Sequence, residues 1–181
     1  KQMQKISQDL AINGNSASGS GYLSIGNGLL YKLDNTYSAS TINVTKSALT
    51  NASTVVSYMD YILSNMPDEI RDMENVVALV SPTAFATLQI GLRNANYFNY
   101  NTTGADSYSF KMPGYSNVTI YSIPSMANNR AIVTYPQNII HALGVETPLE
   151  LWFSKDNQEY RIHAEIFEAY DIHFEGLVVR M

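Results

Sequence analysis

The last third of the chain is a succession of short apolar runs separated by tight polar turns, and this pattern constrains the fold more than any other feature. Apolar runs at residues 131–135, 139–145 and 149–153 precede a longer run at residues 159–167. Along that longer run apolar and polar residues alternate, which is typical of a strand with one buried face. The alternating positions are Tyr160, Ile162, Ala164 and Ile166 on one face and Arg161, His163 and Glu165 on the other. Strands joined by the polar turn 155–157 predict a two-stranded ribbon that must lie against something else.

The middle of the chain is predominantly helical in pattern. Residues 47–66 carry the strongest helical signal, a single apolar stripe, and we expect Asn51 or Ser53 to cap the helix and Pro67 to end it. Residues 67–72 are predicted to form a turn or a short second helix. The stripe of the long helix consists of Val55, Met59, Ile62, Leu63 and Met66.

A strand followed directly by a helix is predicted next. Residues 76–80 are a five-residue apolar run, and Ser81 and Pro82 then supply an N-cap and a proline at the first helical position. The inner stripe of this helix is expected to be Phe85, Leu88 and Leu92. Beyond it we expect a tyrosine-rich loop at 97–110, a turn at 113–115 and a strand at 118–123.

The N-terminal segment predicts a helix over residues 1–12, because Met3, Ile6 and Leu10 fall on one face. We expect Gly14 to close this helix in the left-handed conformation. The following segment to residue 28 is rich in Gly, Ser and Asn and is expected to be a long loop with little to bury.

Composition narrows the class of protein. A chain of 181 residues is large enough for one domain with a real core. It has no cysteine, which fits folding in a reducing cytoplasm, and no apolar run of ~18 residues that could span a membrane. The net charge of −5, without a basic cluster, makes direct nucleic-acid binding unexpected. Charged residues make up only 15%, which suits a subunit whose flanks are covered by neighbours as well as it suits an ordinary polar domain.

Candidate catalytic residues are sparse. His141, His163 and His173 have no metal-ligand spacing, so we expect no metal and no cofactor, and His163 is assigned to a polar face or a subunit contact. No nucleophile elbow, phosphate-binding loop or dinucleotide fingerprint is present. An acidic series that could in principle serve glycoside hydrolysis need not converge, so no catalytic residues are assigned and the chain is not expected to be an enzyme. That series is Glu159, Glu165, Glu168, Asp171 and Glu175.

The sequence from Met126 onward also resembles a known family. The run MANNRAIVTYPQNIIHALGVE, followed by LELWFSKDNQEYRI, is similar to the C-terminal part of tailed-phage major capsid proteins, whose fold is named after phage Hong Kong 97. Earlier segments are similar too, namely Asn13-Gly14 after a helix, Gly28-Leu29-Leu30, and the strand-Ser-Pro-helix unit at Ser81. The resemblance covers nearly the whole chain.

The resemblance implies an α+β Hong Kong 97-like phage capsid fold, an axial domain plus part of the peripheral spine domain with a protruding two-stranded ribbon. Residues 1–46 would hold the end of the spine helix and the glycine-rich connecting loop. Residues 47–135 would be the axial domain, 136–175 the peripheral strands and ribbon, and 176–181 a terminal strand returning to the axial domain. The rest of the spine helix, the extended loop and the N-terminal arm would precede Lys1, and without them we expect the fragment to stay small in solution.

The function implied by the resemblance is structural. Copies of the chain would form the hexamers and pentamers of an icosahedral phage or prophage head enclosing double-stranded DNA. Such a head is assembled in the bacterial cytoplasm, with scaffold, portal or decoration proteins as further partners, and needs neither a membrane nor sequence-specific nucleic-acid binding. Tyrosines in the loops would suit such contacts: Tyr97, Tyr100, Tyr108, Tyr115 and Tyr121.

Two alternatives stay open at this point. An encapsulin-type nanocompartment subunit would share the fold and enclose cargo enzymes. A cell-surface or fimbrial adhesin domain would explain the richness in Asn, Thr and Tyr, but it predicts a β-sandwich without the two central helices.

Overall fold

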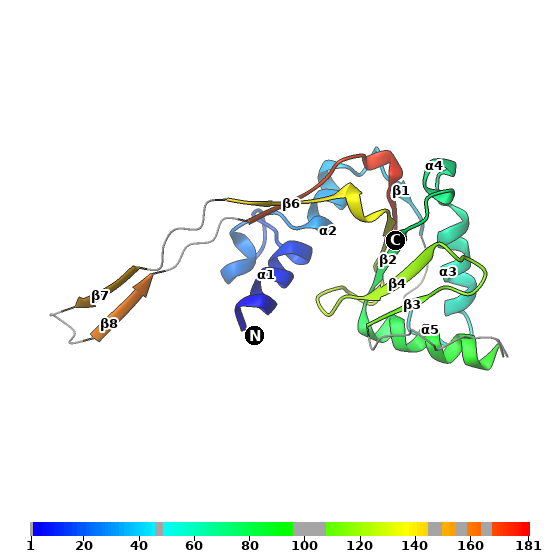
Figure 1. The fold of residues 1–181 in the computed structure, drawn as a ribbon, viewed down its shortest axis with the longest axis horizontal. Coiled ribbons are helices and arrows are strands. Elements are labelled where there is room, and N and C mark those ends of the chain that lie inside the picture. Colours follow the sequence, from blue (N-terminus) through cyan, green and yellow to red (C-terminus); the bar gives the residue numbers. More distant parts are fainter. Residues whose placement is uncertain (1, 46–48, 96–107, 145–149, 155–158, 164–167) are drawn as a thin grey trace.

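The computed structural model describes residues 2–45, 49–95, 108–144, 150–154, 159–163 and 168–181. It shows a helix-flanked sheet from which a thin ribbon extends to one side (Figure 1). The helices are α1 (Gln2–Asn13), α2 (Leu29–Tyr31), α3 (Val55–Ser64), α4 (Asp68–Arg71) and α5 (Pro82–Asn94), with the 3-10 turns η1 (Gly21–Ser24), η3 (Pro136–Asn138) and η4 (Glu175–Leu177) and the π-helical turn η2 (Lys32–Thr36).

The main sheet has six strands in the order β1-β10-β5-β2-β4-β3. It is mixed, because β2 runs parallel to β4 and antiparallel to β5, while β10 runs antiparallel to β5 and parallel to β1. Its strands are β1 (Ile42–Asn43), β2 (Val76–Val80), β3 (Ser109–Lys111), β4 (Val118–Ser122), β5 (Ala131–Thr134) and β10 (Val179–Arg180). Both the N-terminal and the C-terminal half of the chain therefore contribute strands to this sheet.

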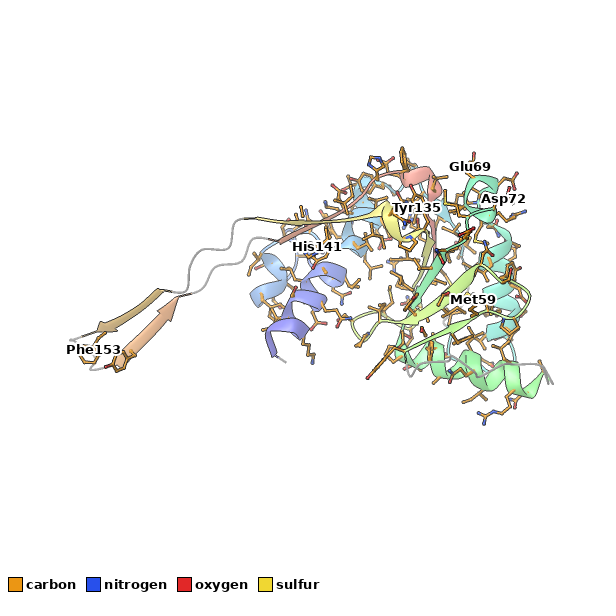
Figure 2. All side chains as sticks on the ribbon, viewed as in Figure 1. Met59, Glu69, Asp72, Tyr135, His141 and Phe153 are labelled. Carbon is orange, nitrogen blue, oxygen red and sulfur yellow. The ribbon has the colours of Figure 1, made fainter. Side chains whose placement is uncertain are left out.

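Each face of the main sheet has its own apolar cluster. Alternate residues of β5 separate the two, since Ala131 and Val133 belong to one cluster and Ile132 to the other. The larger cluster joins the sheet to α3 and α5, which cover one face (Figure 1). The smaller cluster joins Ile132 to the first 33 residues through Ile12, Leu29 and Leu33. Figure 2 shows the side chains that fill these clusters, among them Met59 on α3.

The remaining strands form two separate ribbons. β6 (Ile139–Leu143) pairs antiparallel with β9 (Glu168–Ile172), and β7 (Glu150–Ser154) pairs antiparallel with β8 (Glu159–His163). The β7–β8 hairpin lies well away from the rest of the chain, at the far end of the β6–β9 ribbon (Figure 1). The predicted strand at 159–167 is confirmed only for β8, because 164–167 lie outside the described residues.

Several predicted elements are confirmed. β2 occupies the five predicted residues, with Val76, Ala78 and Val80 buried. Ser81 caps α5, its Oγ accepting a hydrogen bond of 3.1 Å from the N–H of Ala84, with proline in the first turn. The inner stripe of α5 is buried as predicted: Phe85, Leu88 and Leu92.

The start of α3 differs from its prediction. The helix begins at Val55, not at residue 47, although all five predicted stripe residues are buried. Asn51 does not cap it; its Oδ1 accepts a hydrogen bond of 2.9 Å from the N–H of Ser53. Short polar side chains that bond to the nearby backbone compete with helix formation, and residues 52–54 accordingly form turns.

The N-terminal predictions need two corrections. Ile6 is 42% exposed, and from residue 5 onward the side chains that α1 buries are Ala11 and Ile12. Gly14 does not adopt a left-handed conformation; its place follows from crowding, because a Cβ there would lie 2.6 Å from the carbonyl oxygens of Leu10 and Gly26. The glycine-rich segment is therefore packed through its backbone onto the end of α1.

Three further segments bear on the predictions. The end of the predicted loop at 97–110 is strand β3, whereas residues 96–107 lie outside the described part of the chain. The turn at residues 113–115 is confirmed, with Gly114 at a φ of 87°. α3 and α5 beside a single mixed sheet differ from the β-sandwich that the adhesin alternative requires.

Candidate assembly surface

The β6–β9 ribbon leaves the body beside a buried asparagine. Asn138 is fully buried, and its amide nitrogen donates to Thr134 Oγ1 and to the carbonyl of Phe174, both at 2.9 Å. Its Oδ1 accepts a hydrogen bond of 2.7 Å from the N–H of Phe174. Buried polar groups are tolerated when they are bonded in this way, so Asn138 fixes the point at which both strands depart.

Beyond that point the ribbon has no third strand among the described residues. In β6–β9 His141 lies opposite Tyr170, and the two rings stack with centroids 4.5 Å apart and planes 2° from parallel. His141 is labelled on this ribbon in Figure 2. Directly opposed aromatic rings stabilise an antiparallel pair, so this contact contributes to the ribbon that carries the hairpin.

The β7–β8 hairpin is the most isolated element. Phe153 lies opposite Tyr160, with ring centroids 5.2 Å apart, yet the two residues are 49% and 74% exposed. Phe153 stands at the far end of the ribbon in Figure 2. A lone two-stranded hairpin is marginally stable in water. The hairpin therefore presents two largely exposed aromatic rings at the end of the ribbon.

Two ion-pair clusters tie this ribbon and the main sheet to η2. Lys32 Nζ lies 3.1 Å from Asp171 Oδ2 and donates to the carbonyl of Tyr170 at 2.7 Å. Tyr37 Oη donates to Asp171 Oδ1 at 2.6 Å. Asp34 accepts hydrogen bonds from Arg130, the residue before β5, and from Arg180 of β10, the strand beside β5.

These contacts shift two pKa values. The hydrogen bond to Asp171 raises the pKa of Tyr37 to about 12, since ionised Tyr37 could no longer donate it. Burial alone would raise the pKa of Asp171, but hydrogen bonds from Tyr37, from the N–H of Ile172 and from Lys32 outweigh burial and lower it. Asp171 is therefore a structural carboxylate that stays ionised at neutral pH.

The predicted candidates for chemistry do not converge among the described side chains. His141 stacks on Tyr170, and His173 makes an edge contact with Phe174. Asp171 forms an ion pair with Lys32, and Glu165 lies outside the described residues. The assignment of His163 to a polar face or a subunit contact therefore stays a prediction, as does the absence of catalysis. Within the described residues no group of three or more His, Cys, Asp or Glu side chains could hold a metal ion.

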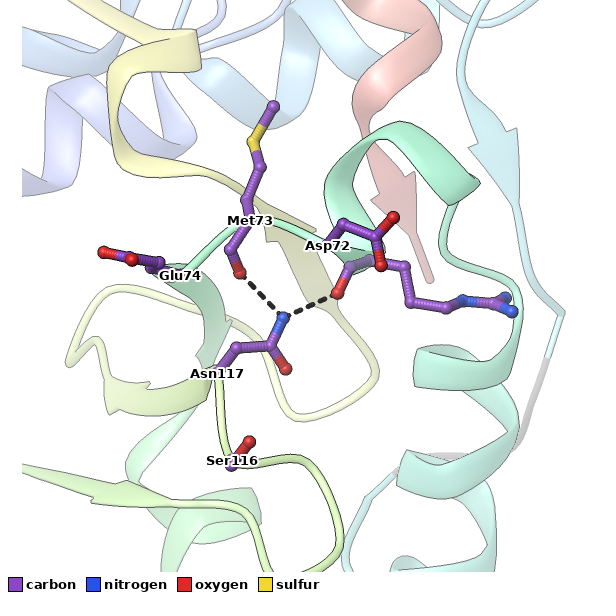
Figure 3. Close-up of a pocket in the computed structure, with 6 residues that line it drawn as sticks. Asp72, Met73, Glu74, Ser116 and Asn117 are labelled. Atoms are coloured by element: carbon purple, nitrogen blue, oxygen red, sulfur yellow. Dashed lines mark hydrogen bonds between the residues drawn. The ribbon is translucent and has the colours of Figure 1, made fainter.

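A polar pocket lies near α4, on the side of the molecule away from the ribbon. Arg71, Asp72 and Glu74 line it together with Met73, Ser116 and Asn117 (Figure 3). The amide of Asn117 donates to the carbonyls of Arg71 and Met73 at 2.9 and 2.8 Å, which joins the segment before β2 to the turn before β4. None of the histidines or acidic residues predicted as candidates lines this pocket.

The loop tyrosines divide into two groups. Tyr108 is 70% exposed and Tyr121 is 39% exposed, whereas Tyr115 packs against the larger apolar cluster. Tyr97 and Tyr100 lie outside the described residues.

Among the helices of the described chain, none combines the length and the apolar character needed to cross a bilayer. The sequence analysis did not predict the buried hydrogen-bonding role of Asn138. Its position in the sequence Pro136-Gln137-Asn138 indicates only a turn residue.

Comparison with known proteins bears on the fold of the chain. No protein-family model matches the chain, and no curated protein matches it. Its fold is similar to that of a chain in the solved structure described as "Satellite phage P4 procapsid including size determination (Sid) protein". The TM-score is 0.66 at 11% sequence identity, and the match covers 99% of this chain and 59% of that chain. The chain therefore has an α+β phage capsid fold, as its resemblance predicted, and spans less than two thirds of the protein it matches.

Proposed function

We propose that this chain is the larger part of a phage-type major capsid protein subunit, which assembles through copies of itself into the hexamers and pentamers of an icosahedral head around double-stranded DNA. The observation that carries this proposal is the capsid fold over 99% of the chain together with the exposed Phe153 and Tyr160 on a hairpin that stands away from the described body. The proposed role is structural, with no catalytic step.

The physical basis is the amount of surface that a shell subunit must offer. Specific protein interfaces bury about 1,000 Å² or more, centred on aromatic and apolar side chains. The β7–β8 hairpin presents the exposed rings of Phe153 and Tyr160. Tyr121 on β4 and Tyr108, just before β3, add two more exposed rings. With only 15% charged residues, neighbouring copies pay little charge desolvation on contact.

Negative-stain electron microscopy of the complete protein that contains this sequence tests the proposal. Closed shells, formed by the protein alone or with its scaffold, are the expected result. A protein that stays uniformly monomeric at concentrations where related shells would form, and that binds a small molecule, would count against the proposal.

The neighbouring genes distinguish a phage head, which encloses DNA, from an encapsulin-type nanocompartment, which encloses cargo enzymes. A gene neighbourhood with terminase and portal genes supports a phage head, whereas an adjacent cargo enzyme supports a nanocompartment.

A further inference from the structure

The turn η2 has an unusual geometry. The N–H of Tyr37 donates to the carbonyl of Lys32 at 2.8 Å, five residues back, so the turn is π-helical. In an α-helix residues five apart point about 140° away from each other. The wider π turn instead brings Lys32 and Tyr37 to one side and leaves Asp34 roughly half a turn away.

The two sides of η2 hold different parts of the molecule. Lys32 and Tyr37 both bind Asp171 of β9, the strand through which the chain returns from the ribbon. Asp34, on the other side, binds Arg130, which precedes β5, and Arg180 of β10. Between them Leu33 is 1% exposed and packs in the smaller apolar cluster.

We propose that η2 is a coupling element, which ties the direction of the β6–β9 ribbon to the edge of the main sheet through its two ion-pair clusters. A rotation of the turn that moved Lys32 and Tyr37 with the ribbon would also displace Asp34 from both arginines. The coupling concerns the single chain and does not depend on whether the chain assembles.

The strength of both clusters makes this coupling effective. Charge-assisted hydrogen bonds are about twice as strong as neutral ones, and these are partly shielded from water. Arg180 is 8% exposed, and its Nε also donates to Thr41 Oγ1 at 2.9 Å. The sheet side is therefore held firmly, and the Leu33 contact prevents the turn from sliding.

Distance measurements between paired spin labels test the coupling. The 181 residues contain no cysteine, so Ala142→Cys on β6 and Thr83→Cys on α5, both exposed, place two unique labels within them. Dilution with unlabelled protein restricts the signal to distances within one chain. One narrow distance is expected for the parent and for the control Asp68→Asn, which removes only an exposed ion pair of 3.5 Å.

The coupling predicts that Asp171→Asn and Asp34→Asn each replace the narrow distance by a broad distribution, although the hydrogen-bond donors to Asp34, Arg130 and Arg180, lie outside the ribbon strands. If only Asp171→Asn broadens it, η2 merely holds the ribbon and the coupling is refuted; if neither does, the coupling is refuted as well. Circular dichroism establishes that each variant is folded. Should an Asn variant fail to fold, Tyr37→Phe and Arg130→Gln replace it and carry the same two expectations.

Discussion

The side chain of Asn138 pairs with the backbone of Phe174 as a neighbouring strand would. Its Oδ1 accepts from the Phe174 N–H at 2.7 Å while its amide nitrogen donates to the Phe174 carbonyl at 2.9 Å. The carbonyl of Asn138 accepts a further bond of 2.9 Å from the N–H of His173. One buried residue thus continues the β6–β9 ladder by side-chain bonds to the point where both strands join the body.

Replacing Asn138 is expected to destabilise the fold strongly. Asn138→Ala removes the acceptor of the Phe174 N–H and one bond each from the Phe174 carbonyl and the Thr134 hydroxyl, which both keep a bond to Leu177. The loss of these buried bonds should lower the free energy of unfolding by about 2–4 kcal/mol. Asn138→Asp should be no better, because a carboxylate cannot donate to the Phe174 carbonyl. Urea unfolding measures both, and Asn129→Ala at an exposed position should stay within about 0.5 kcal/mol. A mild effect of Asn138→Ala would contradict the role assigned to this side chain.

The cap of α5 gives a second stability prediction. Ser81→Ala removes the bond to the Ala84 N–H and also the bond of 2.7 Å between Ser81 Oγ and Asn128 Oδ1. Because Ser81 is 1% exposed, water cannot replace these bonds, and a loss of about 1–2 kcal/mol is expected. Thermal or urea unfolding measures the loss. Ser57→Ala removes an exposed bond from its hydroxyl to the carbonyl of Thr54, at the start of α3; it is the matched control and should change little.

These examples show which parts of the fold follow from the sequence. β2, the Ser81 cap and the stripe of α3 were predictable because local periodicity and capping chemistry decide them. η2 was not, since its π turn is set by Asp171 and the two arginines, which lie about 100 residues or more away in sequence. Gly14 was assigned to the right place for the wrong reason, because crowding against Gly26 is a tertiary contact. The division into axial and peripheral domains stays a prediction.

Tyr37 and Asp171 predict a dependence of stability on pH. The folded pKa of Tyr37 is raised to about 12, so its contribution is complete below the unfolded value of about 10 and is lost as the pH rises through 12. The folded pKa of Asp171 is lowered, so its contribution is present above about 3.9 and is lost as the pH falls through the folded value.

The measurement is urea unfolding from pH 4 to 12 on the parent and on Tyr37→Phe. The difference in unfolding free energy between the two should be constant at neutral pH and should shrink between about pH 10 and 12. A difference that does not change across that interval would show that the hydrogen bond to Asp171 does not contribute to stability.

The exposed rings of the hairpin predict a defect confined to assembly. Phe153→Ser combined with Tyr160→Ser should leave the unfolding free energy of the subunit within about 1 kcal/mol, because both residues are largely exposed. Loss of two aromatic anchors at an interface should raise the concentration needed for assembly about tenfold or more. Sedimentation velocity of the complete protein measures this.

The matched control keeps the rings and exchanges only the hydroxyl. Phe153→Tyr combined with Tyr160→Phe should assemble as the parent does. Equal assembly of the serine and the ring-exchanged variants would mean that the hairpin is not part of the contact.

A cryo-electron microscopy reconstruction of the particles formed by the complete protein tests the central claim most directly. The account predicts a closed wall in which this fold repeats around five-fold and six-fold axes, with Phe153 and Tyr160 covered by another copy. A particle that is a monomer or a small open oligomer, with both rings in solvent, would contradict it.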